Sequence, residues 1–125
     1  MNYKGVLIKE SLKDPTILAS LNVLNSVTEP VVETDQTPWL DFWTLVMIEI
    51  PEAEIEQTAE KISRALDSDR TNWYADFKND AWHYIVFSGK VFKVDLKDPD
   101  QYKAVKDYGR SFGIPEHQLD FASDV

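Results

Sequence analysis

The chain has 125 residues, no cysteine and a formal net charge of −9, which comes from 13 basic and 22 acidic side chains. This length suits one domain, and the lack of cysteine excludes a disulfide framework and a thiolate metal site. The acidic balance argues against nucleic-acid binding, and no apolar run is long enough to cross a membrane. Residues 1–14 show no signal-peptide pattern, so we expect a cytoplasmic protein with one domain over residues 1–125.

The first third of the sequence predicts two strands around a short helix. Tyr3–Lys9 is rich in strand-forming residues. Asp14 can cap a helix that spans residues 15–21 and has proline at its first position. Asn22–Thr34 is rich in Val and Thr and predicts a second strand. Pro30 cannot donate to a β-ladder, so this strand is interrupted there or lies at an edge of the sheet.

Two amphipathic helices follow strands that are apolar on both sides. In Trp39–Ile50, the residues that would point to one face of a strand and those that would point to the other are both largely apolar. This pattern predicts a strand covered on both faces. Pro51–Leu66 has proline and acidic residues in its first turn and a narrow apolar stripe, and predicts the clearest helix. A second helix is expected over Pro99–Phe112, between an N-cap at Asp98 and a terminator at Gly113.

Trp73–Leu96 predicts three short strands joined by tight turns at Asn79-Asp80 and Ser88-Gly89. If each turn has two residues, the following residues oppose one another in pairs: Phe77 and Trp82, Asp76 and His83, Ala75 and Tyr84, Val86 and Val91, Ile85 and Phe92. Side chains then alternate between two faces, and neither face is clearly polar.

The order of elements predicts an α+β domain with a mostly antiparallel sheet of five to six strands and two helices on one face. This is a two-layer sandwich, with the ferredoxin-like arrangement as its nearest analogy. The second sheet face is also apolar and has to be closed. We expect a two-fold homodimer that buries it against a second copy. The alternative is internal cover by Trp39, residues 33–38 and a tail with Leu119 and Phe121, which would leave an aromatic pocket.

Motifs that carry chemistry are mostly missing from the sequence. There is no glycine-rich phosphate-binding motif, no GxSxG and no HExxH, and no spacing singles out a metal site, so no metal or cofactor is predicted. Asp76 and His83 are candidate catalytic residues, an acid–base pair for a small hydrolase or transferase in which Tyr74 or Lys78 contacts substrate. That role requires His83 to open into a pocket. The alternative is a cross-strand pair without chemistry.

Aromatic side chains offer a second candidate site. Trp43, Tyr74, Trp82 and Tyr84 could bind a flat small molecule or a protein partner, whereas core packing is the ordinary role of such residues. Because catalytic signatures are missing, we expect a non-catalytic binding or interaction domain and keep the enzyme as the alternative.

Several phrases of the sequence are similar to those of one protein family. TPWL followed by FW, then WYADFKND, HYIVF, KVFKVD and YGRSFGIPE resemble a family of short uncharacterised prokaryotic proteins of unknown function. The resemblance covers nearly the whole chain. It implies no reaction, ligand or catalytic residue.

Overall fold

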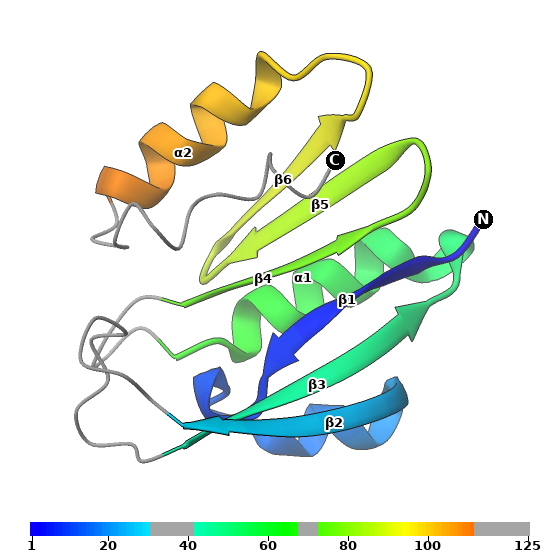
Figure 1. Ribbon diagram of the computed structural model, residues 1–125, viewed down its shortest axis with the longest axis vertical. Helices are drawn as coiled ribbons and strands as arrows, with labels where there is room; N and C mark the ends of the chain where they lie inside the picture. Colours follow the sequence, from blue (N-terminus) through cyan, green and yellow to red (C-terminus); the bar gives the residue numbers. More distant parts are fainter. Residues whose placement is uncertain (31–41, 68–72, 112–125) are drawn as a thin grey trace.

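The computed structural model describes residues 1–30, 42–67 and 73–111. Six antiparallel strands form one sheet in the order β2-β3-β1-β4-β5-β6 (Figure 1). The strands are β1 (Tyr3–Ile8), β2 (Asn22–Pro30), β3 (Phe42–Ile50), β4 (Tyr74–Lys78), β5 (Trp82–Phe87) and β6 (Lys90–Asp95). The helices are α1 (Ile55–Ala65) and α2 (Gln101–Ser111), with 3₁₀ turns at Lys9–Ser11, Pro15–Ser20 and Glu52–Glu54. The predicted α+β domain with an antiparallel sheet is therefore confirmed.

Local sequence signals explain the first elements. The Thr16 backbone N–H donates to Asp14 Oδ1 over 3.2 Å, which caps the turn that begins at Pro15. Among the described strands, β2 lies at the edge of the sheet, which agrees with the edge alternative that Pro30 predicted. The remainder of the predicted second strand, Trp39 at the start of the third, and the segments of the chain proposed as an internal cover lie outside the described residues.

The two helices lie on opposite faces of the sheet, so the prediction of a two-layer sandwich with both helices on one face is wrong. Helix α1 buries its apolar stripe against a cluster that includes Tyr84 and Val86 of β5. Helix α2 buries its stripe against a cluster that includes Ile85 and Phe87 of the same strand. Successive strand residues face opposite ways, so each helix covers one side of β5. In Figure 1, α1 crosses behind the strands and α2 runs beside β6.

The two hairpins differ in how well their register could be predicted. The turn at Gly89 has φ 77° and places Val86 opposite Val91, as expected. The turn after Lys78 is longer, because Asn79 Oδ1 accepts from the backbone N–H groups of Ala81 (2.9 Å) and Trp82 (2.8 Å). The β4–β5 register is consequently shifted by two residues.

This shift corrects three predicted pairs. Phe77 lies opposite Tyr84 instead of Trp82, Ala75 lies opposite Val86, and Asp76 lies opposite Ile85. A shift of two residues keeps every side chain on its predicted face, since the side-chain period of a strand is two. Asp76 and His83 thus remain neighbours, on a diagonal across the two strands.

Gly5 allows β1 and β4 to join into one sheet. It lies opposite Phe77 in the β1–β4 ladder and opposite Ile48 in the β1–β3 ladder. A Cβ atom at Gly5 would overlap the carbonyl oxygen of Asp76 and would lie 2.7 Å from Cδ1 of Phe77. A glycine is therefore required where the two strands approach each other.

Candidate functional site

The predicted pair of Asp76 and His83 forms a hydrogen bond, and a third residue joins it. His83 Nε2 lies 2.7 Å from Asp76 Oδ2, and His83 Nδ1 lies 2.7 Å from the hydroxyl of Tyr102 on α2. With Asp76 ionised, Nε2–H donates to the carboxylate and Nδ1 accepts from the Tyr102 hydroxyl. Tyr102 was not predicted as a site residue. Its position on the apolar stripe of α2 would have indicated this contact if the helix had been placed on the correct face.

Burial determines what this trio can do. The His83 side chain is 0% exposed beneath α2, whereas that of Asp76 is 29% exposed. A general base has to reach the proton that it abstracts. His83 cannot contact a substrate in this structure, so the geometry gives the acid–base role no support. The trio instead connects α2 to β4 and β5 through a buried polar network. Lys78 lies opposite both Lys4 and His83 and does not line the cavity that Asp76 lines.

Two of the four predicted ligand-binding aromatics come together beside Asp76. Trp43 and Tyr74 line a cavity of about 150 Å³, which we name the tryptophan hollow. Its complete lining is Val6, Ile8, Trp43, Leu45, Trp73, Tyr74 and Asp76. The rings of Trp43 and Trp73 meet at a centroid distance of 5.4 Å and an interplanar angle of 64°. The hollow therefore combines aromatic and aliphatic walls with one carboxylate.

The other two predicted aromatics, Trp82 and Tyr84, lie on the opposite face beside α1. There, two adjoining cavities of about 470 and 380 Å³ share Glu56, Tyr84 and Lys93 in their linings. Lys93 Nζ lies 4.2 Å from the centroid of the Trp82 ring and 5.8 Å from that of Tyr84. This cation–π contact places a lysine over the aromatic rings. The predicted four-residue site is thus divided between the two faces of the sheet.

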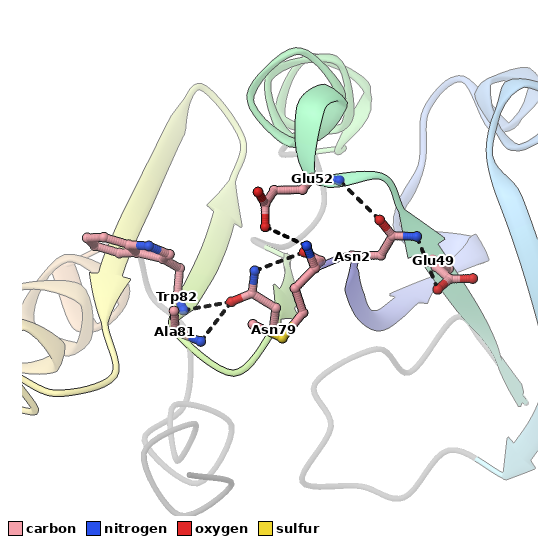
Figure 2. Close-up of polar contacts among 7 residues, drawn as sticks. Asn2, Glu49, Glu52, Asn79, Ala81 and Trp82 are labelled. Atoms are coloured by element: carbon pink, nitrogen blue, oxygen red, sulfur yellow. Dashed lines mark hydrogen bonds and ion pairs between the residues drawn. The ribbon is translucent and has the colours of Figure 1, made fainter.

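We call the two adjoining cavities the groove beside α1. Polar contacts join one end of this groove to the first residues of the chain (Figure 2). The Met1 ammonium group donates to Glu52 Oε2 over 2.7 Å, and Asn79 Nδ2 donates to the Met1 carbonyl over 3.1 Å. Asn2 connects the same region to the β3–α1 junction through the Glu52 backbone N–H and the Glu49 carboxylate, both at 3.4 Å. The first residues are thereby tied to both the β4–β5 turn and the start of the helical segment.

Two tyrosines beneath the groove have perturbed acidities. Burial raises the pKa of Tyr84 above its ordinary value of 10.0, and the Glu56 carboxylate raises it further. Burial likewise raises the pKa of Tyr3, whose ring meets that of Tyr84 edge-on at 5.2 Å. Both phenols therefore stay protonated at neutral pH and can act there as hydrogen-bond donors but not as bases.

Exposed apolar side chains concentrate at one edge of the sheet. Of the six large apolar side chains that are exposed within the described residues, five lie on β2 and β3: Val23, Leu24, Val27, Phe42 and Met47. Val27 and Met47 lie on the same face as the tryptophan hollow, because Val27 is directly opposite Leu45 and Met47 is two residues from Leu45 on β3. This edge is a candidate interaction surface.

Metal and membrane sites have no candidate among residues 1–30, 42–67 and 73–111. No group of three or more His, Asp or Glu side chains in these ranges is placed to hold a metal ion. No helix described there combines the length and the apolar composition that crossing a bilayer requires.

Comparisons with known proteins identify no relative. No protein-family model matches the sequence, and neither a curated protein nor a solved structure matches the chain. The resemblance to short uncharacterised prokaryotic proteins therefore stays a prediction, and the function has to be inferred from the geometry.

Proposed function

We propose that this protein is a non-catalytic interaction domain that self-associates through strand β2. The observation that carries this proposal is the concentration of exposed apolar side chains on β2 and β3. Val27 is 45% exposed and Met47 is 37% exposed, and the two lie on adjacent strands of one sheet face. Exposed apolar clusters on soluble proteins commonly mark contact surfaces.

Strand β2 also offers a backbone edge. All nine of its residues are exposed, and it pairs with β3 along one side. In the part of the chain that the structure describes, no strand pairs with its other side. Such an edge is a template for the addition of another strand, unless charged residues or a proline block it. Here Pro30 lies at the last position of β2, and a register irregularity lies between Val23 and Asn25.

The low charge of β2 is compatible with a second copy of this chain as the partner. The whole chain carries a net charge of −9, so two copies repel each other over most of their surface. Strand β2 is different, because Glu29 is its single charged residue. A contact between two copies of β2 therefore brings few acidic groups together, and the exposed apolar side chains of this strand, Val23, Leu24 and Val27, are available to pack against the second copy.

This proposal moves the predicted homodimer contact from the sheet face to the sheet edge. Helix α2 covers the part of the apolar face that β5 and β6 supply, so a face-to-face dimer cannot use that part. The cytoplasm remains the proposed location, which the lack of cysteine in the sequence supports. A hydrolase or transferase that uses His83 and Asp76 is the less favoured function, because His83 is fully buried.

Sedimentation equilibrium at micromolar concentration tests the dimer. We expect a mass of twice 14.4 kDa for the unchanged chain and a monomer for Val27→Lys, because lysine on an edge strand opposes strand pairing. Ala104→Lys is the matched control, since Ala104 is exposed on α2 and the variant adds the same charge. It should remain a dimer. A monomeric unchanged chain, or a dimeric Val27→Lys variant, would show that β2 is not the contact.

A further inference from the structure

The tryptophan hollow is acidic at one wall and aromatic at the others. Asp76 is the one charged residue in its lining, and Trp43, Trp73 and Tyr74 supply aromatic rings. The faces of such rings are electron-rich and attract cations, and a carboxylate at the same cavity strengthens that attraction. The net charge of −9 adds a long-range negative field that also attracts cations.

Hydrogen bonds hold the Asp76 carboxylate in place. Its Oδ2 atom is bonded to His83, which is fixed in turn by the hydroxyl of Tyr102. No described residue donates a hydrogen bond to the other oxygen, Oδ1, and the side chain keeps 29% exposure. The buried side chains of His83 and Tyr102 thus orient the partly exposed Asp76 carboxylate beside the hollow.

The size of the cavity limits the ligand. A volume of about 150 Å³ corresponds to about five water molecules at their share of liquid volume, which is too small for a drug-sized molecule. It suits the head group of a larger molecule or a small ion. An anion would be repelled by Asp76, and a neutral apolar group would desolvate the carboxylate without compensation.

From this combination we propose that the tryptophan hollow binds a small organic cation, an alkylated ammonium group held against Trp43 and Trp73 and neutralised by Asp76. Val6, Ile8 and Leu45 contact its alkyl substituents. The proposal is independent of the dimer, because none of the residues in the lining belongs to β2.

Titration with choline and with its neutral isostere 3,3-dimethylbutan-1-ol tests the proposal. The full chain would be followed by ¹H–¹⁵N spectra of its tryptophan indole groups. We expect choline to shift the Trp43 and Trp73 signals saturably, while Trp82, on the other face, stays unchanged. The isostere should bind at least about tenfold more weakly than choline, because it lacks the positive charge.

Two lysine variants distinguish recognition in the hollow from general attraction. Val6 lies directly opposite Asp76 in the β1–β4 ladder and lines the hollow, so Val6→Lys should fill the site with the chain's own ammonium group and abolish choline binding. Val91→Lys makes the same change in the groove beside α1 and should leave binding unchanged. Asp76→Asn should weaken choline binding about tenfold, with its folding checked by thermal unfolding because it also removes a charged partner of His83.

Three results would overturn the proposal. Equal binding of choline and its isostere would mean that the hollow recognises apolar volume and not charge. An absence of choline-induced shifts at Trp43 and Trp73 would mean that no cation binds there. Unchanged choline binding by a folded Val6→Lys variant would place the cation elsewhere on the acidic surface.

Discussion

The two halves of the sheet are covered differently. We call β4, β5 and β6 the hairpin half and β2, β3 and β1 the edge half. In the hairpin half, β5 has α1 on one face and α2 on the other, and five of its six residues are buried. In the edge half, α1 and the turns after β1 cover one face, while the opposite face of β3 leaves Met47 exposed and Leu45 partly exposed.

Strands of similar composition therefore have different surroundings. Both β3 and β5 are apolar on both sides, which predicts two covered faces for each. The second helix follows the hairpins along the chain and turns back over them, so it closes the second face of β5 and not that of β3. A two-sided apolar strand thus indicates that cover is needed, but the connectivity decides where the cover lies.

Truncation of one apolar residue in each half should give the largest contrast. Phe87 is fully buried and its ring packs against Tyr74, Phe92 and Tyr108. Phe87→Ala should lower the free energy of unfolding by about 3–5 kcal/mol, through lost burial and the cavity left behind. The edge-half comparison is Val27→Ala, which should change it by less than about 0.5 kcal/mol in the monomer. Urea denaturation at dilute concentration measures both, and similar losses would remove the distinction between the halves.

Removal of one hydroxyl tests how α2 is attached to the hairpin half. Tyr102→Phe takes the hydroxyl away from the buried Nδ1 atom of His83, and we expect a loss of about 1–3 kcal/mol in unfolding free energy. Ser111→Ala is the control on the same helix, because the Ser111 hydroxyl donates to the Tyr108 carbonyl at an exposed position. Its effect should stay below about 0.5 kcal/mol. A neutral Tyr102→Phe change would mean that apolar packing holds α2 without help from the trio.

A smaller effect should appear at alkaline pH. The folded-state pKa of Tyr84 lies above the ordinary value of 10.0, so above that pH the unfolded chain binds fewer protons than the folded chain. This contribution to stability is fully present below pH 10.0 and is lost as the pH rises through the folded-state pKa. The melting temperature should therefore fall above pH 10.0, and less steeply in Tyr84→Phe. Equal slopes for the two proteins would exclude this tyrosine as a cause.

The sequence predicted the elements well because their signals are local. Turn residues, helix caps and apolar stripes indicated the six strands and two helices, and the Ser88-Gly89 hairpin has its expected register. The Asp76–His83 contact was predicted through an incorrect register, and it survived because a shift of two residues keeps both side chains on one face. Local signals determine the face of a strand residue more reliably than its partner.

The candidate sites were predicted less well, because they depend on which face each helix covers. Tyr102 was missed since α2 was expected on the α1 side, away from His83. Tyr74 and Trp82 were assigned to one site although strand alternation already places them on different faces. No pattern in the sequence brings Trp43 to Trp73, because Trp43 lies on β3, Trp73 precedes β4, and β1 separates these two strands in the sheet.

The close approach at Gly5 has a consequence for how the protein unfolds. The β1–β4 ladder joins the two halves through the pairs Lys4–Lys78, Gly5–Phe77 and Val6–Asp76, and Gly5 is in its middle. Helix α1 spans the same junction, since its cluster contains Leu7 from one half and Phe77 from the other. This ladder is short and one core spans it, so we expect the two halves to unfold as a single cooperative unit.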